Sequence, residues 1–305
     1  MVQIVLVHGI AQEQLSAPDL EKDWLPALAG GVGNAGHPGL ADRLWPVRPD
    51  DRFARMAYYG NLFLTPDQQG ETPDLSAGQY ELAEELATEW LVNAAESTRP
   101  RDAGTAQLEL QALHHDPTDA QGLRGSTARA VASLDRIPWF GHAGFHLARL
   151  NKTVAQAVRY LTEPAVRDAA IDAVHQHLDT DTRVVVAHSL GSVVAYEALH
   201  ARPQHLPLLI TLGSPLGLHS VTRRLQRPPA YPSGVKRWIN LVDRDDIVAA
   251  RPHLSTIFDT CRPRDAAFDS TYTVDNGAEP HSATFYLTKP TAGEAIAAAM
   301  AGPSR

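Results

Sequence analysis

Short apolar runs alternate with amphipathic stretches along most of this chain. The runs at 2–7, 184–186, 206–212 and 235–242 are rich in Val, Ile and Leu, and turn-forming residues follow them. Such short runs, apolar on both faces, are typical of buried parallel strands. A less apolar run at 52–60 is a further candidate strand. The pattern predicts an α/β fold with a mostly parallel central sheet flanked by helices.

Apolar residues recur at helical spacing between these runs. Leu82, Leu86 and Trp90, for example, are spaced i, i+4, i+8 and define one face of a helix. Residues 97–125 are polar and rich in turn formers, and we expect a mobile surface loop there. Residues 221–234, rich in Arg and Pro, are a second expected surface loop. The helices predicted in this way cover residues 17–29, 76–96, 147–161, 165–178, 193–200 and 292–300.

Composition narrows the class of protein. The chain has 305 residues, of which 44% are hydrophobic, enough for one large domain or two small ones. A net charge of −8 argues against a nucleic-acid partner. Cys261 is the only cysteine, which excludes an internal disulfide and a cysteine-based zinc site. No leader pattern or run of eighteen apolar residues is present, so we expect a cytoplasmic protein without a membrane segment.

A serine lies at the turn between the run at 184–186 and the helix that follows it. The segment Ala187-His188-Ser189-Leu190-Gly191 places small residues two before and two after this serine. This is the G-x-S-x-G nucleophile-elbow pattern, with Ala187 in place of the first glycine. The alternative is a serine that caps an ordinary helix. The preceding strand and following helix favour the elbow.

Other chemistry-bearing residues follow strands in the same way. Gly9 follows the first strand, where the chain can turn across the sheet edge and point a backbone N–H into the crevice. Asp243, Asp245 and Asp246 follow the strand at 235–242, and His281 lies on a later loop. The order Ser, Asp, His along the chain is that of α/β-hydrolases, and it differs from the orders of chymotrypsin and subtilisin.

With these motifs the chain resembles the α/β-hydrolase superfamily, and within it uncharacterised bacterial members with a lipase-type elbow. The resemblance covers residues 1–64 and 165–300. It implies a hydrolase core at 1–64 and 166–305, with a helical cap inserted at 65–165. It also implies that the first strands of the family are absent, because the chain starts on the strand that leads to His-Gly. The motifs that carry it are Val7-His8-Gly9, Ala187–Gly191, Leu212-Gly213-Ser214-Pro215, Asn240–Ala249 and Pro280-His281-Ser282.

The resemblance and the chemistry of acyl transfer together assign roles. Ser189 is the expected nucleophile and His281 the expected base. Asp246 is the expected acid, since Asp246-Ile247-Val248-Ala249 resembles the Asp-x-Val-Ala form of the family. Counting from the strand end would favour Asp245 instead, and Asp243 is the third candidate. The backbone N–H groups of Ile10 and Leu190 are the expected oxyanion donors. We expect His8 and His188 to be structural, the latter because it should point away from the crevice mouth.

The predicted function is that of a serine hydrolase, carboxylesterase-like or lipase-like, acting on a small-molecule acyl ester through an acyl-enzyme intermediate. Amide and thioester substrates share this chemistry and stay open, as does the oligomeric state. The alternative is a catalytically silent protein of the same fold that binds a ligand or partner through its cap. The pair Trp139-Phe140 could form a substrate wall or simply pack on the core.

Two further kinds of site are not expected. The pattern Gly31-x-Gly33-x-x-Gly36, with Asp50 and Asp51 downstream, matches a dinucleotide fingerprint. Its glycines follow a predicted helix rather than a strand, so we reject a nucleotide cofactor. The histidine pairs His142/His146 and His175/His177 have no third ligand nearby in the sequence, so no metal site is predicted. No cofactor of any kind is expected.

Overall fold

A parallel sheet forms the centre of the molecule. The computed structural model describes residues 2–45, 53–64, 75–115, 122–142, 147–249 and 253–302. Within them, helices flank a six-stranded sheet, which confirms the predicted α/β class. The strands are β1 (Ile4–Val7), β2 (Ala54–Ala57), β3 (Val184–His188), β4 (Leu206–Leu212), β5 (Val235–Asp243) and β6 (Ala267–Val274).

The strand order brings the candidate site residues to one edge of the sheet. The order is β2-β1-β3-β4-β5-β6, and every neighbouring pair in it is parallel. Parallel neighbours need crossover connections, which the helices supply, so all carboxyl ends lie along the same edge. His8 follows β1, Ser189 follows β3 and Asp246 follows β5, and this edge therefore gathers all three.

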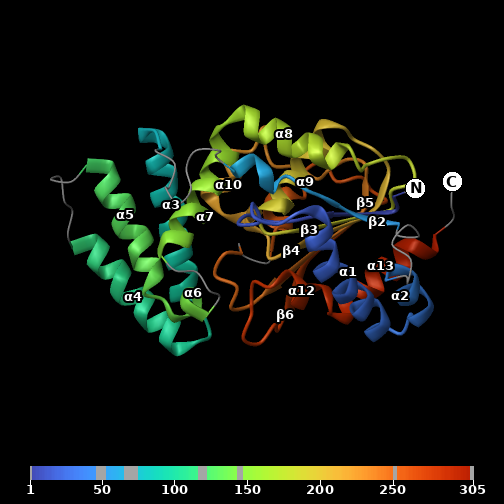
Figure 1. Cartoon of the computed structure of the whole chain (residues 1–305), viewed down its shortest axis with the longest axis horizontal. Coiled ribbons are helices and arrows are strands. Elements are labelled where there is room, and N and C mark those ends of the chain that lie inside the picture. Colours follow the sequence, from blue (N-terminus) through green and yellow to red (C-terminus); the bar gives the residue numbers. More distant parts are fainter. Residues whose placement is uncertain are drawn as a thin grey trace.

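Helices cover both faces of the sheet (Figure 1). Side chains alternate along each strand, so Ile4 and Leu6 pack in one apolar cluster while Val5 and Val7 pack in the other. Burying each such side chain stabilises the fold by about 2 kcal/mol. The first face is covered by α1 (Ala17–Asn34), α2 (Pro38–Leu44), α12 (Ala283–Leu287) and α13 (Pro290–Ala301). The second is covered by α8 (Pro164–His175) and α9 (Leu190–Ala201), with the short helices α10 (His219–Thr222) and α11 (Ser255–Phe258) nearby.

A group of helices from the middle of the chain lies beside the sheet, at the left of Figure 1. The predicted stripe of Leu82, Leu86 and Trp90 faces inward here and is buried. It belongs to the same apolar cluster as Val5 and Val185 of the sheet, so these helices and the sheet share a core. The group consists of α3 (Ala77–Ala95), α4 (Pro100–His115), α5 (Gly122–Asp135), α6 (Pro138–His142) and α7 (Leu147–Thr162).

The expected loop at 97–125 is wrong, because α4 occupies most of it. This helix has Pro100 at its start, where the missing N–H costs nothing, and Asp102 in its first turn. Its buried residues are Asp102 and Ala106, and Leu110 and Leu113 pack partly buried against the same apolar cluster as the sheet. Ala106, Leu110 and Leu113 make only a short apolar stripe, and the polar residues around it favoured the prediction of a loop. The backbone N–H of Trp139 donates to Asp102 at 2.9 Å and ties α4 to α6.

Other boundaries also differ from the expectations. The first helix, α1, continues to Asn34, five residues beyond its predicted end. The edge strand β6 was not predicted, since Asp269 and Ser270 interrupt its apolar pattern. The predicted surface loop at 221–234 carries a fully buried side chain, Tyr231. Two short 3-10 turns, η2 (Gly60–Phe63) and η3 (Pro215–Gly217), also lie within the described residues.

Candidate functional site

Ser189 lies on a sharp turn between β3 and α9. Its φ of 53° and ψ of −133° are unusual for a residue with a side chain and cost about 1–3 kcal/mol. Two hydrogen bonds to the Ser189 backbone hold the turn: Ser189 N–H donates to the carbonyl of Leu212 at 3.0 Å, and the side-chain Oγ of Ser192 donates to the Ser189 carbonyl at 2.6 Å. Gly191 lets the helix approach β1, since a Cβ there would lie 2.2 Å from the His8 carbonyl oxygen. The strained turn presents the Ser189 side chain to a pocket.

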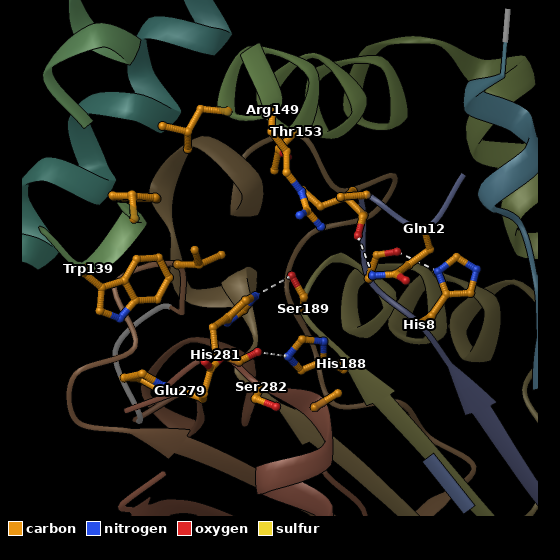
Figure 2. A pocket seen from close by; sticks show the side chains of 18 of the residues that line it. His8, Gln12, Trp139, Arg149, Thr153, His188, Ser189, Glu279, His281 and Ser282 are labelled. Carbon is orange, nitrogen blue, oxygen red and sulfur yellow. Dashed lines mark hydrogen bonds between the residues drawn. The ribbon is translucent and has the colours of Figure 1, made fainter. Parts of the chain in front are cut away.

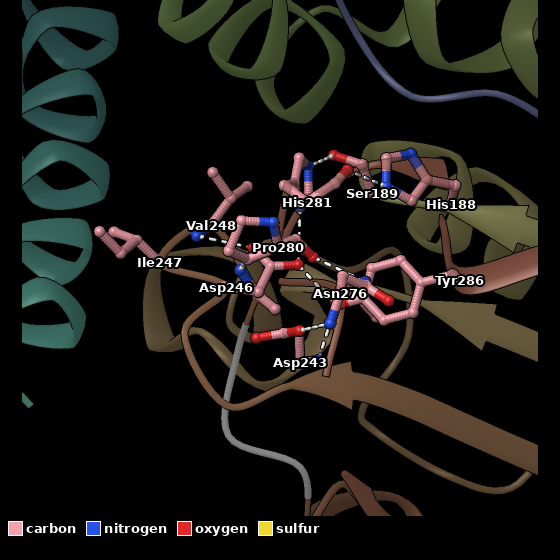
Figure 3. Close-up of polar contacts among 12 residues, drawn as sticks. His188, Ser189, Asp243, Asp246, Ile247, Val248, Asn276, Pro280, His281 and Tyr286 are labelled. Atoms are coloured by element: carbon pink, nitrogen blue, oxygen red, sulfur yellow. Dashed lines mark hydrogen bonds and ion pairs between the residues drawn. The ribbon is translucent and has the colours of Figure 1, made fainter. Parts of the chain in front are cut away.

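His281 contacts the serine (Figure 2) and bridges it to a carboxylate (Figure 3). Its Nε2 lies 3.0 Å from Ser189 Oγ, and its Nδ1 lies 2.8 Å from Asp246 Oδ2. An ionised carboxylate only accepts hydrogen bonds, so Nδ1 carries the proton. In the neutral imidazole, Nε2 is then left as an acceptor for the serine hydroxyl. Three residues far apart in the sequence thus form one hydrogen-bonded line.

The Asp246 carboxylate is fully buried yet well supplied with donors. Tyr286 Oη donates to Oδ2 at 2.8 Å, alongside His281 Nδ1. The backbone N–H groups of Val248 and Ala249 donate to Oδ1, both at 3.2 Å. Four hydrogen-bond donors therefore satisfy the buried carboxylate and offset the cost of its burial. Figure 3 shows Tyr286 approaching from α12.

The other two aspartates point elsewhere. The Asp243 carboxylate accepts hydrogen bonds from the backbone N–H groups of Asp245, at 2.8 Å, and Asn276, and burial raises its pKa. The Asp245 carboxylate accepts from Ser97 Oγ at 3.0 Å and from Thr98 N at 2.9 Å. Burial alone would raise the pKa of Asp245, but hydrogen bonds from Thr98 and Ser97 outweigh it and lower the pKa. Of the three candidates, Asp246 is the one placed against His281.

His8 orients the backbone that follows β1. The N–H of Tyr59 donates to His8 Nε2 at 3.1 Å, which makes Nδ1 the protonated nitrogen, and Nδ1 then donates to the Gly9 carbonyl at 2.6 Å. Burial lowers the pKa of His8 to about 4, so the ring is neutral at pH 7. In a trans peptide the N–H points opposite to the C=O. The N–H of Ile10 is therefore directed away from the His8 ring, and Ile10 lines the pocket with Ser189.

The second expected donor adjoins the serine directly. Leu190 is the first residue of α9, and the first N–H groups of a helix have no partner inside it. Ile10 directly follows Gly9, and Leu190 directly follows Ser189. Each of these two turns therefore carries one of the expected backbone N–H donors.

His188 differs from the expectation that it points away from the crevice. It lines the same pocket as Ser189, and its Nε2 donates to the carbonyl of His281 at 2.9 Å (Figure 2). The two imidazole rings are 4.6 Å apart. Burial, and secondarily the His281 ring, hold the pKa of His188 well below its usual value. A neutral His188 therefore holds the His281 backbone in place.

A pocket of about 340 Å³ opens onto Ser189 and His281. Trp139 and Phe140, which are 2% and 1% exposed, both pack in the core and also line this pocket. Arg149, Leu150 and Thr153 of α7 form another part of its wall (Figure 2). The helices of the 65–165 region therefore contribute directly to the walls around the serine.

Only some residues of the rejected cofactor and metal patterns belong to the described parts of the chain. Gly31 and Gly33 lie inside α1, and a Cβ on Gly31 would lie 2.0 Å from the Leu287 carbonyl oxygen, so this glycine allows α1 and α12 to pack closely. Asp50, Asp51 and His146 lie outside the described residues, as does the side chain of His142. His175 contacts the Ala198 carbonyl through Nε2 at 2.9 Å. Among the described residues, no three His, Cys, Asp or Glu side chains are grouped as metal ligands would be.

Comparison of the chain with protein-family models, with curated proteins and with solved structures found no match. In the described parts of the chain, no helix combines the length and the apolar character needed to cross a bilayer. The geometry around Ser189 is therefore the basis on which a function can be argued.

Proposed function

We propose that this protein is a serine hydrolase of the α/β-hydrolase type that cleaves an ester-like bond through an acyl-enzyme intermediate. One observation carries the proposal: Ser189 Oγ, the His281 ring and the Asp246 carboxylate are joined by contacts of 3.0 and 2.8 Å at a pocket. A serine hydroxyl is a weak nucleophile until a base takes its proton, and this arrangement provides the base.

The proposed reaction has two halves. Ser189 Oγ attacks the carbonyl carbon while its proton passes to His281 Nε2, and the resulting imidazolium is stabilised by Asp246. The tetrahedral intermediate then expels the alcohol, which takes the proton from Nε2, and leaves an acyl group on Ser189. In the second half, water gives a proton to Nε2 and attacks the acyl carbon. Ser189 regains its proton as the carboxylic acid departs.

Negative charge on the substrate oxygen needs donors in both halves. The N–H groups of Ile10 and Leu190 are proposed for this role, because His8 fixes the peptide that carries the first, Ile10 lines the pocket, and the second begins α9 beside Ser189. In other acyl-transfer enzymes the loss of one such donor costs about 3–4 kcal/mol of transition-state stabilisation.

The walls of the pocket favour a small apolar acyl ester. A volume of about 340 Å³ lies at the lower end of the range of ligand pockets, roughly 300–1,000 Å³. Four large aromatic side chains contribute to its surface: Trp24, Trp90, Trp139 and Phe140. We therefore propose a carboxylesterase acting on short acyl chains.

The test is hydrolysis of p-nitrophenyl acetate and butyrate by the purified chain. Ser189→Ala and His281→Ala should each lower kcat by about 10³-fold to 10⁶-fold while leaving the melting temperature near that of the wild type. Ser255→Ala is a matched control, because Ser255 pairs with Ser270 beside β6 and does not line the pocket. Hydrolysis that survives in Ser189→Ala would refute the proposal. A folded wild-type chain that binds but never cleaves esters would favour a silent binding protein.

A further inference from the structure

The peptide that follows Ile10 is held from both sides. The N–H of Ala11 donates to Gln156 Oε1 at 2.8 Å. The carbonyl of Ile10 accepts from Gln12 Nε2 at 3.3 Å, and Gln12 lies on the pocket wall (Figure 2). Ala11 has a φ of 61°, a left-handed conformation that a residue with a Cβ adopts only at a cost. The surrounding hydrogen bonds must therefore maintain this turn.

The orientation of the Gln156 amide is determined by its other partner. Gln156 Nε2 donates to Glu13 Oε2 at 2.9 Å, and Lys152 Nζ lies 2.7 Å from Glu13 Oε1. Burial alone would raise the pKa of Glu13, but hydrogen bonds from Lys152 and Gln156 outweigh it and lower the pKa. An ionised Glu13 accepts and cannot donate, so it takes the NH₂ end of the amide. The carbonyl end of Gln156 is thereby directed at Ala11.

The contact joins two distant parts of the chain. Gln156 and Lys152 are on α7, whereas Ala11 and Glu13 follow β1. Gln156 is 3% exposed and Glu13 is 8% exposed, whereas the Lys152 side chain at the edge of the network is 43% exposed. A buried hydrogen bond of this kind is costly to break, because both partners would be left without a substitute.

We propose that Gln156 is a positioning residue that orients the oxyanion-binding N–H of Ile10 by holding the peptide after it through Ala11. This inference rests on the proposed function, in which Ile10 donates to the substrate oxygen. His8 holds the peptide before Ile10 and Gln156 holds the peptide after it. Helix α7 of the 65–165 region thus orients the N–H of Ile10, which lies on the loop after β1.

Gln156→Met tests this role, because methionine has a similar length and makes no strong hydrogen bonds. The donor at Ile10 acts on the tetrahedral intermediate, so kcat for p-nitrophenyl butyrate should fall about 10-fold to 100-fold while KM changes less than about twofold. The second-order rate of reaction with a fluorophosphonate should fall by a similar factor. Gln79→Met is the matched control: Gln79 bonds Thr162 and Glu163 from α3, away from the loop, and this variant should keep the wild-type kcat.

A charge exchange distinguishes positioning from general support of the fold. Gln156→Glu alone sets two carboxylates against each other and should lower kcat at least 10-fold. The double variant Glu13→Gln/Gln156→Glu restores one amide facing one carboxylate, with an oxygen for Ala11, and Lys152 can pair with position 156 at i, i+4. It should recover kcat to within about threefold of the wild type. This comparison also decides the matter if Gln156→Met does not fold.

Three outcomes would overturn the inference. One is a wild-type kcat in Gln156→Met, a second is an equal loss in Gln79→Met, and a third is no recovery in the double variant. In each case the wild-type chain still cleaves the ester, so the proposed function stands. A wild-type chain that neither cleaves esters nor reacts with the phosphonate would overturn both the proposed function and this inference.

Discussion

The environment of Asp246 separates it from two aspartates only one and three positions away. Its carboxylate has no exposed surface and takes four hydrogen bonds, one of them from the His281 ring. Asp245, by contrast, is bonded to Ser97 and Thr98 at the end of α3. Successive side chains in the turn after β5 point in different directions. A shift of one residue along the chain therefore decides which carboxylate contacts His281.

Asparagine substitutions at the three aspartates should therefore have unequal effects on turnover. We expect Asp246→Asn to lower kcat about 10³-fold to 10⁴-fold, because an amide stabilises the imidazolium poorly and can favour the wrong His281 tautomer. Asp245→Asn and Asp243→Asn should keep kcat within about tenfold, since their contacts are to backbone and loop groups. Ester hydrolysis by the three variants, with melting temperatures alongside, measures this order. A larger loss in Asp245→Asn would contradict it.

Some site residues could be predicted from the sequence and others could not. Ser189 and His281 follow from the elbow pattern and from the order of the chain, and the structure brings them together. Tyr286, which donates to Asp246, carries no comparable signal, because a tyrosine in an apolar helix usually indicates packing. The sequence likewise gives no signal that Gln156 has a special role. Its importance depends on α7 lying against the loop after β1, a contact between residues 145 positions apart.

At the scale of elements, burial determined which predictions succeeded. Strands β3, β4 and β5 are buried along most of their length, so their apolar runs are plain in the sequence. Helix α4 buries little and was expected to be a loop, and the edge strand β6 was not expected at all. The hydrophobic periodicity of a segment depends on how much of its surface is buried. Elements at the periphery bury little surface, so their sequences show only weak periodicity.

The helices at 77–162 are fastened to the loop that carries Asp246. Asn93 Nδ2, on α3, donates to the carbonyls of Ile247 and Ala249 at 2.9 and 3.1 Å. Asp245 makes a second attachment through Ser97 and Thr98. Together with Gln156, these contacts join the helices to both loops of the candidate site. The region predicted as a cap is thus bonded to the loop that carries Asp246, and it also forms part of the pocket wall.

At the scale of the whole molecule, the sheet and its two helical layers place the site at the carboxyl edge of the strands, against the helices at the left of Figure 1. The layered α/β class was predictable because it depends on many apolar positions at once. The attachment of the middle helices to one another and to the loop after β1 was not predictable, because contacts such as those of Asp102 and Gln156 join residues far apart in the sequence.

Buried histidines should make the fold sensitive to mild acid. Burial lowers the pKa of His8 from 6.5 to about 4, and lowers that of His188 as well. Between pH 6.5, the pKa of His8 in the unfolded chain, and about pH 4, its pKa in the folded chain, the unfolded chain binds more protons than the folded one. The stability that neutral His8 contributes is therefore fully present above pH 6.5 and is lost as the pH falls toward 4. At pH 5, His8 alone should lower the free energy of unfolding by about 2 kcal/mol.

Urea unfolding at pH 7.5 and pH 5.0 measures this loss. His177 and His200, whose pKa values burial also lowers, act in the same direction. Asp243, whose pKa is raised by burial, acts in the opposite direction at lower pH. An equal free energy of unfolding at the two pH values would contradict the neutral, buried state of His8.

The most direct test of an activated Ser189 is labelling of the folded chain with a fluorophosphonate probe, followed by peptide mapping. The probe reacts with a serine whose proton is taken by a neighbouring base and whose oxyanion is stabilised. We predict one labelled peptide, carrying the probe on Ser189, and its loss in Ser189→Ala. Absence of label from a folded wild-type chain, or label that persists in Ser189→Ala, would contradict the account.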